Sequence, residues 1–208
     1  SIQISKLFYE RFIKNGEITL FSPNHVPDLY EAFGMPEFDS LYLKYEKDKS
    51  IPKQTIGAQE LFQALLKERA ETGRIYIMNL DHCNTHSSFK DKVYMSNLCQ
   101  EITLPTTPVQ HIDDKEGEIA LCILSAINLG LLTDMNELEE LCDLSVRALD
   151  EIIDYQEYPV EAAKISTQAR RSLGIGYIGL AHYLAKNQVG YEDKKALKIV
   201  DKITEAFQ

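Results

Sequence analysis

The sequence predicts an α/β protein that is rich in helix. Short runs of β-branched and aromatic residues alternate with longer amphipathic segments, which is the pattern of strands connected by helices. The run EIALCILSAINLG at 118–130 is nearly all apolar, as in strands buried on both faces of a parallel sheet or barrel. With 208 residues, the chain can bury one substantial core, so a single domain is the first expectation.

The first half of the chain is expected to be mostly helical, with two short strands. Helices are predicted at 2–14, 26–33, 37–47 and about 53–72. The last of these carries an apolar stripe made of Ile56, Leu61, Phe62, Leu65 and Leu66, and Gly73 ends it. Strands are predicted at 18–21 and 74–80, because both runs are short and rich in β-branched or aromatic residues.

The second half is expected to hold one buried strand followed by helices. The strand is 118–130, and the helices are predicted at 134–154, 161–171, 176–187 and 193–207. Asp134 and Glu137 form a D-x-x-E pattern that marks the start of the first of these helices. The last helical pattern ends without a cap, and the apolar strands need more neighbours than this chain supplies. We therefore expect a piece of a larger protein or one half of a split one.

Composition and charge exclude several classes of partner. The formal net charge of −10 would repel a polyanion, so DNA or RNA is not an expected partner. No apolar run of about 18 residues is present, so no membrane span is expected, and the N-terminus lacks the organisation of a signal peptide. The four cysteines contain no C-x-x-C pair, so a structural zinc site is not predicted. Free thiols in a reducing cytoplasm are the expectation.

The segment SNLCQEITLP at 96–105 places one thiol between two polar side chains. In an extended chain Asn97, Cys99 and Glu101 would share one face, because side chains alternate along a strand. At about 3.3 Å per residue, the outer two would lie about 13 Å apart in a straight strand. Joint action on one small group therefore requires a bend. From spacing alone, an exposed edge strand is the simpler explanation.

Three further motifs have simple structural explanations. Cys122 lies in the apolar run EIALCIL and is typical of a small thiol packed in a core. His82 and His86 are four residues apart, but Asn84 and Thr85 between them favour a polar loop over a metal-binding helix. The glycines of GIGYIG at 174–179 match the dinucleotide pattern G-x-G-x-x-G without its preceding strand, so close packing at a turn is expected.

The chain resembles the catalytic large subunit of class I ribonucleotide reductase, of the bacterial and phage type. The runs SNLCQEITLPTTP and GEIALCILSAINLG carry the resemblance, and N-x-C-x-E with a second cysteine 23 residues later is specific. Four more runs are similar to that subunit: RFIKNGEITLFSPNHVPDLYEAFG, ERAETGRIYIMNLDHCNTHS, DYQEYPVEAAK and RRSLGIGYIGLAHYLAK. The resemblance implies part of a ten-stranded α/β barrel over residues 1–208, with a finger loop at about 96–105.

The resemblance also implies the reduction of ribonucleoside diphosphates to 2′-deoxyribonucleoside diphosphates. It gives Cys99 the role of a transient thiyl radical that takes the 3′ hydrogen of the ribose. Glu101 would be a general base on the 3′-OH, and Asn97 would hold the ribose hydroxyls. Cys122 would be one of two thiols that supply reducing equivalents and end as a disulfide. Its partner thiol should precede residue 1, and neither Cys83 nor Cys142 falls at that position.

The same resemblance implies what this chain would need from elsewhere. A radical would come from a metal-containing small subunit, and reductant from a thioredoxin or glutaredoxin type of protein. The activity and effector region, where ATP and deoxynucleotides bind, would precede the chain, and further barrel segments would follow. The full large subunit is expected to be a homodimer, and this chain alone should not turn over. No cofactor or metal is expected to bind to this chain itself.

Two alternatives are left open. The chain could be an inactive fragment or split-gene product that serves as an assembly module for a complementary chain. It could also belong to a glycyl-radical enzyme, which uses a related barrel with a finger-loop cysteine. The long similarity to class I subunits favours the reductase.

Overall fold

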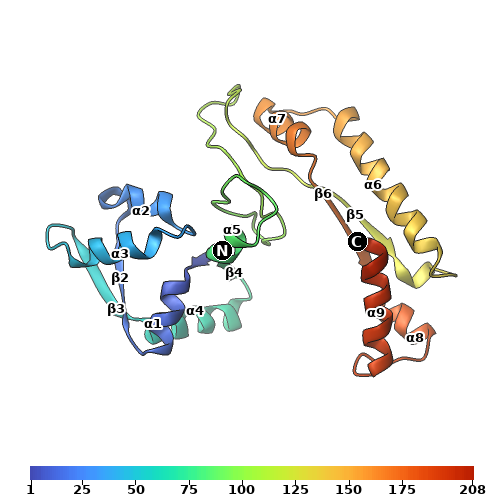
Figure 1. Ribbon diagram of the computed structural model, residues 1–208, viewed down its shortest axis with the longest axis horizontal. Coiled ribbons are helices and arrows are strands. Elements are labelled where there is room, and N and C mark those ends of the chain that lie inside the picture. The colour runs from blue at the N-terminus through green and yellow to red at the C-terminus, as the bar shows by residue number, and fades with distance from the viewer. The chain divides into compact units, whose positions relative to one another are not determined.

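All strands of the structure occur in pairs, and helices pack against each pair. The computed structural model describes residues 1–208 and divides into two units, Ser1–Thr106 and Thr107–Gln208 (Figure 1). Unit 1 has two strand pairs and unit 2 has one, and each unit has its own apolar clusters. The mixed helix and strand content confirms the predicted α/β class, but the three two-stranded sheets of this chain do not form a closed barrel.

Unit 1 contains two strand pairs. Its elements are β1 Ile2–Ile4, α1 Lys6–Ile13, β2 Glu17–Phe21, the 3-10 helix η1 Pro23–His25, α2 Pro27–Ala32, α3 Phe38–Lys47, β3 Lys53–Gly57, α4 Ala58–Thr72, β4 Ile77–Asn79 and α5 Leu80–Thr85. Strand β1 pairs with β4 in parallel, and β2 pairs with β3 in antiparallel fashion. Chain segments that are distant in sequence therefore build both sheets.

Two predicted helices begin later than expected. Residues 2–4 form β1, and α1 starts only after Ser5, whose hydroxyl accepts a hydrogen bond from the backbone N–H of Phe8 at 3.3 Å. Likewise, residues 53–57 form β3 and the helix starts at Ala58. In both places pairing with a distant strand satisfies the backbone, and this outweighs local helical propensity. The strand expected at 74–80 shortens to β4.

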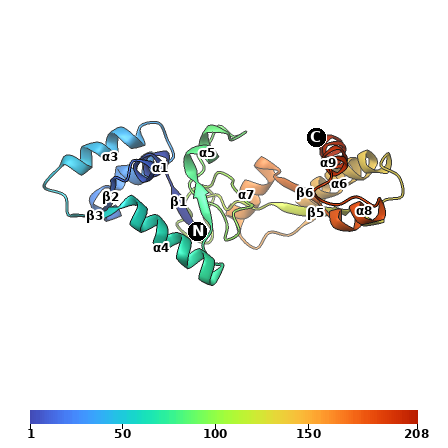
Figure 2. The ribbon, with the colours of Figure 1, turned by 90° about the horizontal axis from the view of Figure 1, so that it is seen from below.

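The sequence predicts a polar loop at 81–92, but the structure has a short helix at the start of this segment. Residues Leu80–Thr85 form α5, a helix of six residues that directly follows β4 beside the N-terminus (Figure 2). The side chain of Asn84 turns back on the helix and donates to the carbonyl of Leu80 at 3.3 Å. The hydroxyl of Thr85 donates to the carbonyl of Asp81 at 2.8 Å. Polar side chains that usually favour turns are here satisfied by the preceding helical turn.

The helices of unit 1 bury one apolar face each. Leu7, Leu29, Phe38 and Tyr42 belong to one cluster, formed by α1, α2 and α3. The apolar stripe predicted for the helix at about 53–72 is confirmed in part: Leu61, Phe62 and Leu65 pack against a second cluster, whereas Leu66 is 43% exposed and Ile56 lies in β3. Aromatic rings meet edge to face there, as in Phe12 and Phe62 with centroids 5.0 Å apart.

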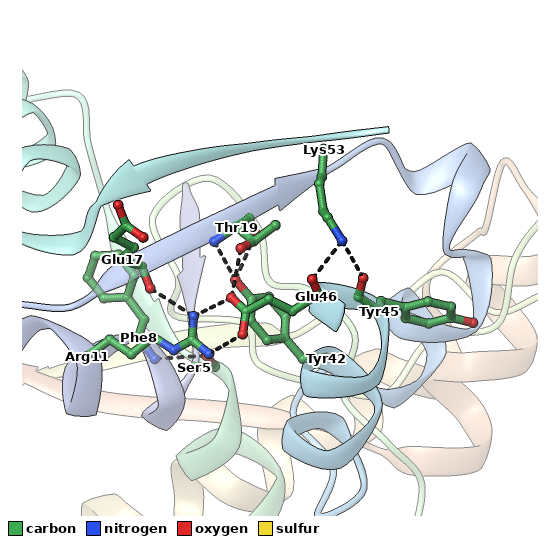
Figure 3. A network of polar contacts seen from close by, with 9 residues as sticks. All are labelled: Ser5, Phe8, Arg11, Glu17, Thr19, Tyr42, Tyr45, Glu46 and Lys53. Atoms are coloured by element: carbon green, nitrogen blue, oxygen red, sulfur yellow. Dashed lines mark hydrogen bonds and ion pairs between the residues drawn. The ribbon is translucent and has the colours of Figure 1, made fainter. Parts of the chain in front are cut away.

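A polar network joins four elements of unit 1 (Figure 3). The guanidinium group of Arg11 on α1 donates to both carboxylate oxygens of Glu46 on α3, at 2.5 and 2.7 Å. Thr19 on β2 exchanges backbone hydrogen bonds with the hydroxyl of Tyr42 at 2.7 and 2.8 Å. The ammonium group of Lys53 on β3 donates to three carbonyls at the end of α3. These contacts fix α1, β2, β3 and α3 together.

Unit 2 contains one parallel strand pair with helices along it. Its elements are β5 Ile123–Asn128, the 3-10 helix η2 Leu129–Leu131, α6 Glu137–Tyr155, α7 Glu161–Arg170, β6 Leu173–Ile178, α8 Leu180–Lys186 and α9 Lys194–Phe207. Strands β5 and β6 pair over their full length, with Ile123 opposite Leu173 and Asn128 opposite Ile178. Helices α6 and α9 pack against each other and form one cluster with residues of both strands (Figure 1).

Two expectations for unit 2 are wrong in part. The run 118–130 contains a strand of only six residues, and one face of it is open, since Leu124 is 61% exposed. The helix predicted at 176–187 starts at Leu180, because residues 173–178 form β6. Two glycines interrupt the helical pattern in this segment, and pairing with β5 decides its conformation. No helix of the chain is both long and apolar enough to cross a membrane.

Candidate functional site

The segment around Cys99 bends sharply, as joint action of its three polar groups would require. The backbone N–H of Gln100 donates to the carbonyl of Asn97 at 3.2 Å, which closes a four-residue turn. The side-chain oxygen of Asn97 also accepts a hydrogen bond from the backbone N–H of Ile102 at 3.0 Å. Cys99 lies inside this double closure and is exposed, as are Leu98 and Glu101. The segment is therefore a turn and not the straight edge strand that spacing alone favoured.

The turn is held at a strained backbone position. Gln100 has a φ of +66°, in the left-handed region that residues with a Cβ rarely adopt. Its carbonyl accepts a hydrogen bond from the hydroxyl of Thr103 at 3.2 Å, while its side-chain Nε2 is buried without a hydrogen-bond partner. Strain of this kind persists only where surrounding contacts impose it, and it gathers at functional sites.

Contacts with α5 and the N-terminus fix the chain that enters the turn. Asn84 on α5 exchanges two hydrogen bonds with the backbone of Val93, at 2.8 and 3.0 Å, and Val93 is fully buried. The amide of Gln3 on β1 donates to the carbonyl of Tyr94 at 2.6 Å. The hydroxyl of Ser1 donates to the carbonyl of Leu98 within the turn at 3.3 Å. The exposed turn is therefore anchored on the β1–β4 pair and α5.

Cys122 lies in unit 2, directly before β5. It is partly buried, and its thiol donates a weak hydrogen bond to the carbonyl of Ile123 at 3.9 Å. Two contacts fix the preceding residues to α7. The carboxylate of Glu118 pairs with Arg170 at 2.8 Å, and the backbone N–H of Ile119 donates to the carbonyl of Ala162 at 3.1 Å. The position is thus not that of a fully enclosed core thiol. Asn97, Cys99 and Glu101 belong to unit 1.

The other motifs found in the sequence serve structural roles. His82 lies on α5 and His86 caps its C-terminal end, with ring centroids 5.4 Å apart. No three His, Cys, Asp or Glu side chains of the chain gather in a way that could hold a metal ion. The first five residues of GIGYIG, 174–178, lie in β6, and its last glycine, Gly179, has a φ of +75° and caps the N-terminus of α8. The motif was expected to provide close packing at a turn, and among its three glycines only Gly179 has the positive φ of a turn residue.

Neither arginine of the Arg170-Arg171 pair is left for an anionic ligand. Arg170 pairs with Glu118, and Arg171 pairs with Asp150 at 2.6 Å and with Asp154 at 3.0 Å. These hydrogen bonds hold the pKa of both aspartates below the ordinary value. Two surface hollows of about 430 and 380 Å³ occur in unit 1, and neither includes the turn at Cys99.

One residue beside the candidate site was missed by sequence reasoning. Gly174 on β6 lies next to the sulfur of Cys122, and a Cβ at that position would be 3.0 Å from Sγ. The glycine pattern was visible in the sequence, but its neighbour depends on the register between β5 and β6. The register between two strands that are distant in the sequence cannot be predicted from a local sequence pattern.

The arrangement defines an α/β protein with an exposed thiol on a braced turn and a second, partly buried thiol at the start of a parallel strand pair. The family model for the ribonucleotide reductase barrel domain matches residues 1–208. The chain therefore belongs to the ribonucleotide reductase barrel-domain family.

Curated relatives with high identity agree with this family. The chain is 58% identical to the ribonucleoside-diphosphate reductase subunit alpha of Haemophilus influenzae over 212 residues, and 55% identical to the reductase 1 subunit alpha of Escherichia coli. It is 42% identical to the subunit alpha of Enterobacteria phage T4, which it matches over 94% of its own length. The first two matches cover the whole chain but only 28% of each relative. The predicted resemblance to bacterial and phage large subunits is confirmed.

Proposed function

We propose that this chain forms part of the catalytic barrel of a ribonucleoside-diphosphate reductase large subunit. That enzyme reduces ribonucleoside diphosphates to 2′-deoxyribonucleoside diphosphates for DNA precursor synthesis. The observation that supports the proposal best is the braced turn: it exposes Cys99 between Asn97 and Glu101, in a chain that belongs to the reductase barrel family. The turn is proposed to be the tip of a finger loop.

Each polar group of the turn has a proposed chemical role. Cys99 becomes a thiyl radical. It takes the 3′ hydrogen atom from the ribose, which breaks the C3′–H bond and forms an S–H bond, and it returns this hydrogen at the end of the reaction. The carboxylate of Glu101 accepts the proton of the 3′-OH as a general base. The amide of Asn97 donates to a ribose hydroxyl through Nδ2, because its Oδ1 already accepts from Ile102.

Cys122 is proposed to supply reducing equivalents together with a second thiol from another part of the large subunit. The two thiols give up two electrons and two protons and form an S–S bond. In exchange, the 2′-OH of the substrate leaves as water and C2′ gains a hydrogen. A thioredoxin or glutaredoxin type of protein then reduces the disulfide for the next turnover. A reducing cytoplasm suits this cycle.

The remaining parts of the machinery are proposed to lie outside this chain. A separate small subunit that contains a metal centre supplies the radical, and the large subunit works as a homodimer. Nucleotide effectors bind to other segments of the large subunit. Because the chain spans about 28% of its relatives, it should not turn over alone.

Reconstitution tests the proposal directly. The complete large subunit that contains this segment is mixed with its small subunit and a dithiol reductant, and CDP reduction is measured. We expect dCDP formation, loss of it in Cys99→Ser, and no multiple turnover in Cys122→Ser. Correct assembly without any dCDP would instead favour a chain that serves only as an assembly module.

A further inference from the structure

We propose that Gly174 is a positioning residue for Cys122, and that its missing side chain gives the sulfur the space to form and release a disulfide. The inference rests on the proposed redox role of Cys122. Gly174 is the first glycine of GIGYIG and lies in β6. Its place in the strand does not by itself explain why the residue is a glycine.

The register of the parallel pair brings the two residues together. Leu124 on β5 lies opposite Gly174 on β6, and Cys122 precedes Leu124 by two residues, so it projects on the same side. A Cβ built on Gly174 would lie 3.0 Å from the Sγ of Cys122 and 2.5 Å from Cδ2 of Leu124. A carbon and a sulfur atom are in ordinary contact only at larger separations, so the thiol would have to move.

A neighbouring glycine on the same strand shows that the requirement is specific. Gly176 is two residues further along β6 and shares the face of Gly174, yet a Cβ there would meet nothing within 4 Å. Neither glycine has a positive φ, so alanine costs no backbone strain at either position. The two positions differ chiefly in what lies beside them: Cys122 and Leu124 in one case, open space in the other.

The clash with Leu124 is separable from the clash with Cys122. The side chain of Leu124 is 61% exposed in this chain, so nothing within the chain prevents it from turning away from Gly174. The thiol of Cys122 has less freedom for its proposed work, because a disulfide requires an S–S distance near 2.05 Å and a dihedral angle near 90°. A methyl group on Gly174 would exclude part of the space in which the sulfur moves between the thiol and disulfide positions.

The chemistry explains why this space matters for turnover. Two thiols must join into one disulfide as the substrate loses its 2′-OH as water, and an external dithiol must then attack that disulfide in line. Both steps need the Cys122 sulfur to reach its partner sulfur. Misplacement of a reacting atom by about 1 Å can cost about 100-fold in rate.

Three variants of the complete large subunit test the inference: Gly174→Ala, Gly176→Ala as the matched control, and Gly174→Ala combined with Leu124→Ala. CDP reduction, thermal unfolding and the midpoint potential of the active-site disulfide are measured for each. We expect Gly174→Ala to lower kcat about tenfold with KM unchanged, and the double variant to remain equally slow. The disulfide potential should shift by about 30 mV, which corresponds to a tenfold change in equilibrium. Gly176→Ala should match the wild type.

Two results would overturn the inference. Equal activity of Gly174→Ala and Gly176→Ala would show that the space beside Cys122 is not needed, and full recovery in the double variant would assign the effect to Leu124. Failure of the proposed function has a different signature. In that case Cys122→Ser would turn over like the wild type, and the role of Gly174 would fall with it.

Discussion

The side-chain oxygen of Asn97 accepts a hydrogen bond from the backbone N–H of Ile102 at 3.0 Å, across the turn that exposes Cys99. A backbone N–H can only donate, so the contact fixes which end of the amide faces Ile102. The Nδ2 group, which makes no hydrogen bond in the structure, is then left to donate to another molecule. One side chain thus has both a bracing function and a proposed substrate-binding function.

These two functions can be separated by mutation. Asn97→Asp keeps an oxygen that accepts from Ile102 but cannot donate, so the turn should persist while turnover falls about 100-fold. Asn97→Ala removes both groups, so the turn should also become sensitive to limited proteolysis. Turnover of the complete large subunit and protease cleavage within 96–105 are the two measurements. Wild-type turnover in Asn97→Asp would remove the amide from the mechanism.

Gln100 should tolerate glycine but not a β-branched residue. Its φ of +66° is unstrained for glycine, and the buried Nε2 without a partner would disappear. Valine at this φ should cost about 1–2 kcal/mol and deform the turn. We expect Gln100→Gly to turn over within about threefold of the wild type and Gln100→Val to lose more than about tenfold. Equal turnover of the two variants would argue against a left-handed residue at the tip.

Three of the four cysteines, Cys83, Cys99 and Cys142, should differ in their reactivity toward iodoacetamide. Cys99 is exposed, whereas burial raises the pKa of the Cys83 thiol and that of the Cys142 thiol. Because the thiolate is the nucleophile, alkylation of Cys83 and Cys142 near pH 7.5 should be at least about tenfold slower than that of Cys99. Timed alkylation followed by peptide mass spectrometry measures all the rates in one sample. Faster labelling of Cys83 would contradict the exposure of the turn.

The Arg11–Glu46 pair should make the stability of unit 1 depend on pH. Hydrogen bonds from Arg11 hold the pKa of Glu46 below its ordinary value, despite an opposing effect of burial. A lowered folded-state pKa stabilises the fold above the ordinary glutamate pKa of about 4.3, and this stability is lost as the pH falls through the folded-state value. Thermal unfolding between pH 7 and pH 3 measures the effect.

Arg11→Met is the matched control for this pH dependence. It keeps the packing of the aliphatic stem but removes the hydrogen bonds to Glu46, so it should destabilise the chain by about 2 kcal/mol at pH 7. The difference between variant and wild type should shrink as the pH falls through the lowered folded-state pKa of Glu46, because a protonated Glu46 loses its ion pair with Arg11. A constant difference would point to packing alone.

Local patterns predicted those parts of the fold that local contacts decide. The amphipathic helices at 26–33, 37–47, 161–171 and 193–207 are confirmed within a few residues, since each buries one apolar face. Strands β1, β3 and β6 were missed because each is short and depends on a partner far away in the sequence. Tertiary pairing supplied the hydrogen bonds there.

In the candidate site, too, the contacts between distant elements could not be predicted from local sequence patterns. Spacing alone favoured an exposed edge strand at 96–105 and showed only that joint action of the three polar residues would need a bend, whereas the structure has a turn at Asn97–Gln100. The bracing of the turn by Asn84 and Gln3 could not be predicted, because both contacts cross between elements. The roles of Cys99, Glu101, Asn97 and Cys122 remain predictions that chemistry must test.

The most direct measurement is CDP reduction by the complete large subunit with Cys99→Ser. The hydroxyl O–H bond of serine is too strong for the radical exchange, whereas its small size preserves the turn, so folding and nucleotide binding should stay close to wild type. We predict no detectable dCDP from this variant under conditions in which the wild type turns over many times. Retained turnover in Cys99→Ser would contradict the proposed radical role of Cys99.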